Sequence, residues 1–352
     1  MRFLASDAGA ECRRRGRAAP ARGGTSHIPM PIRVRETILL PPGGFAPPAD
    51  RSETVRALLA LPTVPQKSEA WLALRQELVS ASAFGQVLGV SKFGSADDLL
   101  LQKAAPELAP PFQGDAPPLL FGVRHEDTVM GCYRARAGLA PGDVHEFGLL
   151  VDPSGLPIGA SPDGITRDGV MIELKAPWRR ALVDGHIPPE YELQCQGQLA
   201  VADLDVCDYC EATVHEHEDE DVWEAHARDL GPDDSGAIWG VETRDGSRYE
   251  RSPPGAAPDE VLAWVRERRR DPAQPAGARA WLWTLDQIQI VRVERDRARW
   301  ESEIRPKVCA FWDRVLRARA RVARGLPPEP GMRLTIPVQR GGAAPPDPPA
   351  GG

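Results

Sequence analysis

The sequence predicts an α/β protein in which a mixed β-sheet is flanked by helices. Two kinds of pattern support this fold class. Short apolar stretches bounded by turn residues are typical of strands, and they occur at residues 147–152, 157–160, 172–176, 206–214 and 281–293. Longer stretches with apolar residues three and four positions apart are typical of helices, and they occur at residues 68–78, 121–137, 188–201 and 296–324. The 352 residues suffice for one sizeable domain with additions or for two small domains.

Residues 1–66 are expected to be disordered. They contain an arginine cluster at 13–17 and Pro- and Gly-rich sequence at 41–48, with no apolar run typical of a secretory signal. Translation could begin at Met1 or at Met30, and the second start would remove the arginine cluster.

Three helices are expected next, each with a serine at its start. Ser68, Ser82 and Ser95 each precede apolar residues at helical spacing, where a hydroxyl caps the first N–H groups. A helix start with a nearby arginine, here Arg75, is also an anion-binding arrangement. The alternative for Arg75 and Ser82 is an exposed helix arginine and an ordinary capping serine.

The central feature of the sequence is a β-hairpin with charged residues. Residues 172–176 read as a strand, so Glu173 and Lys175 project from one face and the apolar residues between them from the other. The turn residues at 167–169 connect this strand to Asp163. Two converging carboxylates beside an amine favour a hard cation such as Mg²⁺ or Mn²⁺.

The register of this hairpin decides whether the carboxylates meet. A two-residue turn would pair Asp163 with Leu174, on the wrong face of the pleat. The metal-site interpretation therefore requires a bulge, a turn of odd length, or an Asp163 that lies in a loop before its strand. The alternative is a surface hairpin whose Glu173 and Lys175 are merely solvated.

The sequence after the hairpin continues the α/β pattern. Pro177 ends the strand, and the helix at 188–201 carries Gln194 and Gln198 on one face. Cys207 and Cys210, followed by two histidines, leave open a Cys/His metal site against the simpler interpretation of buried thiols.

The remaining sequence divides into three parts. Residues 216–280 read as an acidic, then Pro/Gly-rich insertion, whose acidic start we expect to be a solvated loop, with a possible helix at 258–270. Residues 281–325 read as a strand and a basic helix that Pro306 should kink, and residues 326–352 as a disordered tail. We expect the core to span residues 67–215.

The composition bounds the setting in which the protein works. The net charge of −7 gives no overall attraction to nucleic acid, and no apolar run approaches the ~18 residues of a membrane span. The six cysteines show no disulfide rhythm. We therefore expect a reducing, cytoplasmic or nuclear-type location, without secretion and without a membrane.

Five motifs occur in an order that resembles a known nuclease family. They lie at 71–75 with 79–85, at 122–126, at 161–164, at 172–177 and at 191–199. The hairpin motif resembles that of the PD-(D/E)xK nuclease superfamily. The surrounding chain resembles its lambda-exonuclease or YqaJ-type viral recombinase branch over residues 67–215, with a weaker likeness at 281–320.

The resemblance implies a restriction-endonuclease-like core with assigned residues. Asp163, Glu173, Glu126 and the Leu174 carbonyl would hold Mg²⁺, with Mn²⁺ possible. Lys175 and Gln194 would complete the catalytic group, and Arg75 and Ser82 would contact a terminal 5′-phosphate of DNA.

The resemblance also implies an activity and its partners. The activity would be metal-dependent 5′ to 3′ exonuclease action on double-stranded DNA ends in recombination or end processing, by a virus- or phage-encoded protein. One partner would be a single-strand annealing protein. Copies of the protein would also assemble into a trimer. The alternatives are a structure-specific or endonucleolytic member of the superfamily, and a non-catalytic DNA-binding or assembly module.

Overall fold

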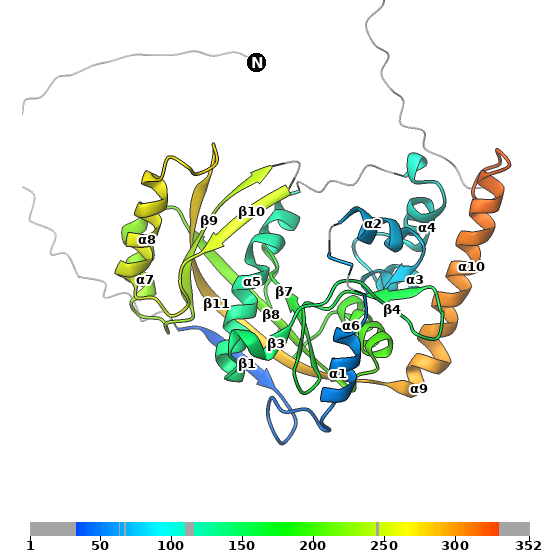
Figure 1. Ribbon diagram of the computed structural model, residues 1–352, viewed down its shortest axis with the longest axis horizontal. Helices are drawn as coiled ribbons and strands as arrows, with labels where there is room; N and C mark the ends of the chain where they lie inside the picture. The colour runs from blue at the N-terminus through cyan, green and yellow to red at the C-terminus, as the bar shows by residue number, and fades with distance from the viewer. Residues whose placement is uncertain (1–32, 63, 67, 110–115, 244–245, 331–352) are drawn as a thin grey trace, which may run out of the picture. The chain divides into compact units, whose positions relative to one another are not determined.

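A mixed β-sheet forms the centre of the fold (Figure 1). The computed structural model describes residues 33–62, 64–66, 68–109, 116–243 and 246–330. Within these ranges the main sheet has eight strands. Their spatial order is β10 (Gly246–Arg251), β9 (Ser235–Thr243), β11 (Arg279–Glu294), β8 (Val206–His217), β7 (Val170–Lys175), β6 (Gly164–Thr166) and β3 (Val144–His145), while β1 (Arg35–Leu39) pairs with β11. The predicted fold class, a central mixed sheet flanked by helices, is confirmed.

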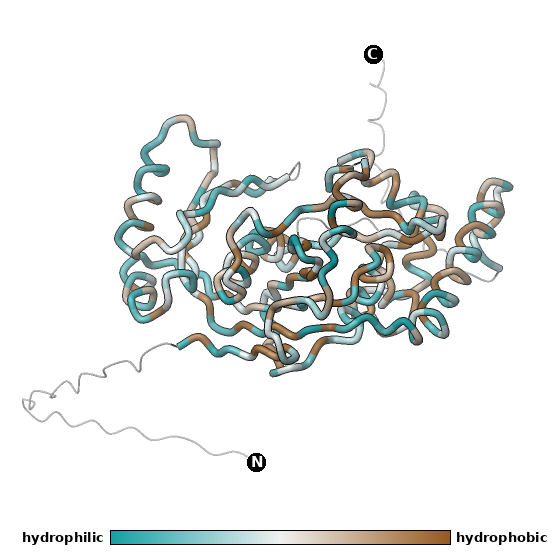
Figure 2. Tube along the Cα trace, turned by 60° about the horizontal axis from the view of Figure 1, so that its bottom comes forward, coloured by the Kyte–Doolittle hydropathy of each residue, from teal (hydrophilic) through white to brown (hydrophobic). Residues whose placement is uncertain are grey.

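The two sides of the sheet are covered by different helices. On one side Ile172 and Leu174 belong to a hydrophobic cluster with Tyr133 of α5 (Pro117–Ala137). On the other side Met171 and Tyr209 belong to a cluster that includes residues of α6 (Pro189–Ala202). Because side chains alternate along a strand, Glu173 and Lys175 share the face opposite Ile172 and Leu174, as predicted, and this face looks toward α6. Figure 2 shows brown, hydrophobic stretches running through the middle of the described chain.

Helix α6 makes the connection between the parallel strands β7 and β8. Such a pair requires a crossover, and a helix is its usual form. Gly197 allows α6 to approach α3 (Phe84–Val87) closely, because a Cβ atom at Gly197 would lie 2.5 Å from the Phe84 ring. This packing fixes the face of α6 that looks onto β7.

Short helices precede the hairpin, and a small second sheet joins them to it. The helices are α2 (Glu69–Gln76), η1 (Ala81–Ala83), α3, α4 (Ala96–Ala104) and η2 (Pro106–Leu108), with η3 (Pro141–Asp143) further on. The second sheet orders β2 (Val79–Ser80), β5 (Ile158–Ala160) and β4 (Leu150–Val151). The hydroxyls of Ser68 and Ser95 cap α2 and α4, as predicted. Ser82 does not cap α3, because it lies inside η1 and its hydroxyl pairs with that of Ser80 at 2.9 Å.

The boundary predicted for the disordered N-terminal segment is wrong. Residues 1–32 lie outside the described residues, but β1 and α1 (Ser52–Leu59) form within the segment expected to be disordered. The reason is long-range pairing, since β1 runs parallel to β11 with Arg35 opposite Gln287.

A buried ion pair ties this N-terminal segment to the sheet. The guanidinium of Arg292 donates to both carboxylate oxygens of Asp208, at 2.7 and 2.9 Å, and also to the carbonyls of Gly44, Phe45 and Ala46. Tyr133 donates to the same carboxylate at 2.9 Å. The arginine therefore uses the full set of N–H donors that its fork offers.

The acidic insertion is structured, which corrects the expectation of a solvated loop. Residues 216–280 complete β8, add β9 and β10 to the sheet, and form α7 (Glu220–Ala227) and α8 (Pro258–Arg270). The predicted helix at 258–270 is confirmed. Trp223, Trp239 and Val265 form part of a separate hydrophobic cluster beneath α7 and α8. The acidic residues at the start of this segment therefore lie on a folded extension of the sheet.

The C-terminal helix forms as predicted, with a defect at the expected place. It consists of α9 (Arg297–Arg299), a π-helical segment labelled η4 (Trp300–Ile304) and α10 (Arg305–Val322), so the irregular turn immediately precedes Pro306. Part of its basic face is paired, since Arg314 contacts Asp97 and Glu329. The tail from residue 331 lies outside the described residues. No helix in the described part is both long and apolar enough to cross a membrane.

Candidate active site

The β6–β7 hairpin brings Asp163 opposite Glu173. Gly164 pairs with Ile172 and Ile165 with Met171, so the preceding residue falls in register with Glu173. The turn spans three residues, 167–169, and Gly169 adopts a φ of +98° that favours glycine. The structure therefore has both an odd-length turn and an Asp163 just before its strand, two of the arrangements that the metal-site interpretation allowed.

The Asp163 carboxylate is held by the backbone of the opposite strand. Its Oδ2 accepts a hydrogen bond from the Leu174 N–H at 2.6 Å. Burial and the negative charge of Glu173 raise the pKa of Asp163, and Glu126 adds to this effect, while Lys175 and the Leu174 N–H oppose it. The site therefore has more negative charge than its own cation neutralises.

Glu173 is the most enclosed acid of the site, with 1% of its surface exposed. Its Oε1 accepts hydrogen bonds from Lys175 Nζ and, at 2.7 Å, from Gln194 Nε2. Its Oε2 accepts one from Gln198 Nε2 at 2.7 Å. Both amides come from α6, one turn apart on the face that looks onto β7.

Lys175 is the cation of the group. Burial alone would lower its pKa, but the charges of Glu173 and Asp163 outweigh that effect and raise it. Its Nζ also lies 4.9 Å from the centroid of the Tyr191 ring. The amine is therefore charged at neutral pH, and it can donate hydrogen bonds without losing its proton.

The structure brings together most of the predicted catalytic residues and adds one. Asp163, Glu173, Lys175 and Gln194 converge, and Glu126 on α5 lies within electrostatic range of Asp163. The contact of Gln198 with Glu173 was not predicted, although its spacing of four residues from Gln194 was the available signal.

The donor set suits Mg²⁺ or Mn²⁺. Among the described residues no group of three or more His, Cys, Asp or Glu side chains is placed to hold a metal ion. Mg²⁺, however, is usually bound through one or two carboxylates, with waters and substrate phosphates completing its shell. Asp163 and Glu173, with the Leu174 carbonyl beside them, fit that pattern. A divalent ion would also relieve the excess charge that raises the pKa of Asp163.

The alternative Cys/His metal site is not formed. Cys207 and Cys210 are buried and belong to hydrophobic clusters on different sides of the sheet. Their thiol groups therefore cannot share one ion.

Arg75 is connected to the hairpin through a tryptophan. Its guanidinium lies 4.4 Å from the centroid of the Trp71 ring, and the Trp71 indole N–H donates to Ser161 Oγ at 3.2 Å. Ser161 lies two residues before Asp163. Lys103 donates to the Arg75 carbonyl, and burial, with the charges of Arg75 and Arg319, lowers the pKa of Lys103 to about 8.

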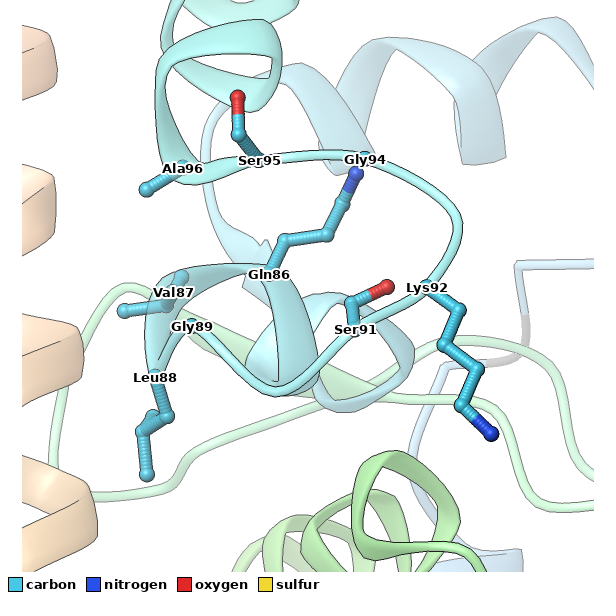
Figure 3. A pocket seen from close by; sticks show the side chains of 9 residues that line it. All are labelled: Gln86, Val87, Leu88, Gly89, Ser91, Lys92, Gly94, Ser95 and Ala96. Carbon is cyan, nitrogen blue, oxygen red and sulfur yellow. The ribbon is translucent and has the colours of Figure 1, made fainter.

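Ser82 is exposed, and its hydroxyl pairs with that of Ser80 at 2.9 Å. The nearby loop encloses a hollow of about 500 Å³ that does not include the predicted catalytic residues (Figure 3). The hollow is lined by Gln86, Val87, Leu88, Gly89, Ser91, Lys92, Gly94, Ser95 and Ala96. Figure 3 shows the Gln86 side chain reaching toward Gly94, whereas Lys92 extends outward.

Comparison with known proteins gives a match to a family model and several similar proteins. Residues 70–205 match the YqaJ-like viral recombinase domain. An uncharacterized protein of Acanthamoeba polyphaga mimivirus is 30% identical over 199 residues, which are 52% of this chain and 35% of that protein. The chain thus spans about a third of the length of this curated relative.

Two solved structures are similar at lower identity. An alkaline exonuclease from Laribacter hongkongensis aligns with a TM-score of 0.44 and 20% identity, covering 73% of this chain and 97% of that chain. A phage-related exonuclease from Haemophilus somnus aligns with a TM-score of 0.37 and 12% identity, covering 68% and 95%. The five motifs of the sequence fall within or overlap residues 70–205, the range that matches the YqaJ-like viral recombinase domain.

Proposed function

We propose that this protein is a Mg²⁺-dependent deoxyribonuclease that degrades duplex DNA from its ends in the 5′ to 3′ direction. The observation that carries the proposal is the hairpin site itself. Two carboxylates in register, Asp163 and Glu173, lie beside a charged Lys175 within a YqaJ-like domain.

Each residue would have a distinct part in phosphodiester hydrolysis. Asp163, Glu173 and the Leu174 carbonyl would hold the divalent ion, with Glu126 close by. When bound, that ion supplies charge stabilisation for the phosphate and lowers the pKa of water. The Lys175 amine would orient the attacking water and donate hydrogen bonds to developing negative charge. Gln194 and Gln198 hold the Glu173 carboxylate in one rotamer, so that its orientation is set before substrate binds.

Affinity for DNA would come from contacts to its backbone. Arg75 stacks on Trp71, which donates to Ser161 beside the hairpin, and it would contact a terminal phosphate there with help from Ser82. Such contacts make binding steeply salt-dependent and nearly independent of sequence.

The cellular role follows from the product. Removal of one strand leaves a 3′ single strand that an annealing protein can use in recombination. We propose residues 67–215 with 281–325 as the nuclease core of a virus- or phage-encoded protein that works in a reducing compartment, in line with its free cysteines. A trimeric ring would confer processivity, and sedimentation analysis tests that state.

One experiment separates this activity from its alternatives. Linear duplexes with and without a 5′-phosphate, and a covalently closed circle, are incubated with Mg²⁺ at two salt concentrations. We expect loss of the linear duplex, a preference for the 5′-phosphate that Arg75→Ala removes, and an intact circle. Cleavage of the circle would indicate an endonuclease. Undiminished activity of Lys175→Ala would place the chemistry elsewhere, and no cleavage of any substrate would favour a DNA-binding module.

A further inference from the structure

The folded insertion packs against the helix that carries Glu126. Arg124 of α5 donates to Glu216 of β8 at 2.7 Å and pairs with Glu242 of β9. His125 contacts the same Glu216 at 2.7 Å. These contacts attach the α5 turn just before Glu126 to β8, which the insertion extends, and to β9, which the insertion adds.

Arg251, the last residue of β10 in the insertion, contacts the same turn of α5. Its Nη1 lies 2.6 Å from Asp127 Oδ2, and its Nη2 donates to the Arg124 carbonyl at 3.1 Å. The two contacts bracket Glu126 in the chain. The side chain is 27% exposed, so solvent does not fully screen its charge.

Glu126 lies within electrostatic range of both this arginine and the hairpin. Asp127 and Glu126 are the leading acidic influences on the pKa of Arg251, which burial lowers. Val129 and Tyr133, further along α5, belong to the same hydrophobic cluster as Ile172 and Leu174 of the hairpin. The α5 turn is therefore the element through which the insertion can act on the site.

We propose that Arg251 is a positioning residue for the divalent-ion site: its two contacts hold the α5 turn so that the Glu126 carboxylate faces the catalytic hairpin. This inference rests on the proposed function and extends it to the insertion, which thereby becomes part of the active site. Replacing a residue that contacts a metal ligand and orients it typically changes metal affinity by 10- to 100-fold. We expect a loss of about tenfold here, because Glu126 is one ligand beside Asp163 and Glu173.

The test measures Mn²⁺ binding to the DNA-free protein by electron paramagnetic resonance. Arg251→Ala and Arg251→Lys should both weaken binding by about tenfold, because a lysine ammonium keeps the charge but cannot make both contacts of the planar fork. Asp127→Asn should do the same, and the double variant should lose little more. Arg248→Ala, on the exposed side of the same strand, serves as the control and should bind Mn²⁺ like the unaltered protein.

The outcomes distinguish this inference from the function on which it rests. If the unaltered protein binds Mn²⁺ and cleaves DNA, but Arg251→Ala and Arg251→Lys bind Mn²⁺ within twofold of it, the positioning role is wrong. Binding by Arg251→Lys equal to that of the unaltered protein would show that charge alone matters, which also overturns it. If the unaltered protein neither binds Mn²⁺ nor cleaves DNA, the proposed function itself fails. Urea melts identify unfolded variants, and Asp127→Asn carries the test where Arg251→Ala does not fold.

Discussion

Replacing Lys175 with methionine should destabilise the metal-free protein and make its stability depend on divalent ions. The change removes the cation that contacts Glu173 Oε1, while keeping the length and most of the volume of the side chain. The affected carboxylate is 1% exposed, and its neighbour Asp163 is also acidic. The variant therefore leaves two close carboxylates without the amine between them.

The expected cost follows from the remaining partners of Glu173. Breaking a buried ion pair costs about 3–5 kcal/mol when the remaining charge is left uncompensated. Here Gln194 and Gln198 still donate to the carboxylate, and the lysine was 22% exposed. We therefore expect a smaller loss, about 2–3 kcal/mol, in the free energy of unfolding.

The assay is urea unfolding in EDTA, arranged as a double-mutant cycle with Glu173→Gln. Because the double variant no longer buries the glutamate charge, we expect a coupling energy of at least about 1 kcal/mol. Mg²⁺ at about 100 times its Kd should add about 2.7 kcal/mol to the stability of Lys175→Met. Additive single variants, within about 0.5 kcal/mol, would refute a tightly coupled Glu173–Lys175 pair.

Three further predictions address neighbouring residues. In urea melts with EDTA, Asp163→Asn should be more stable than the unaltered protein at pH 8, and the difference should vanish toward pH 4. The reason is that a raised pKa means that the folded state is destabilised once the carboxyl loses its proton. A variant that is less stable at pH 8 would contradict this sign. Gln198→Met should lose about 1.5–3 kcal/mol of unfolding free energy with its hydrogen bond to Glu173, and a loss below about 0.5 kcal/mol would show that this bond is weak. Gly197→Ala should cost about 1–3 kcal/mol in the same assay, since its Cβ would meet the Phe84 ring, whereas unchanged stability would mean that α6 and α3 separate easily.

The local parts of the site could be predicted from the sequence because they depend on short-range geometry. Alternation along one strand placed Glu173 and Lys175 on the face opposite Ile172 and Leu174. The sequence leaves the hairpin register open, because it does not distinguish a two-residue turn from a three-residue turn. The structure resolves it through the positive φ of Gly169.

The parts that sequence could not predict depend on distant partners. Strand β1 has an exposed pattern with little apolar periodicity, and its place is set by β11, some 250 residues later along the chain. The acidic residues 216–221 read as a solvated loop, yet Glu216 accepts a hydrogen bond from Arg124 and contacts His125. Neither partner can be inferred from local composition, because both pairings arise only when the sheet is complete.

The contacts of the Arg292 guanidinium limit how far the protein can be shortened from its N-terminal end. A fragment starting at residue 67 would lose the carbonyls of Gly44, Phe45 and Ala46, three of the five acceptors that surround this side chain. The Arg292 N–H groups would exchange the three carbonyls for water, and β11 would lose its parallel partner β1. We therefore expect a stable fragment to begin before residue 67, and recombinant expression should retain the residues from 33 onward.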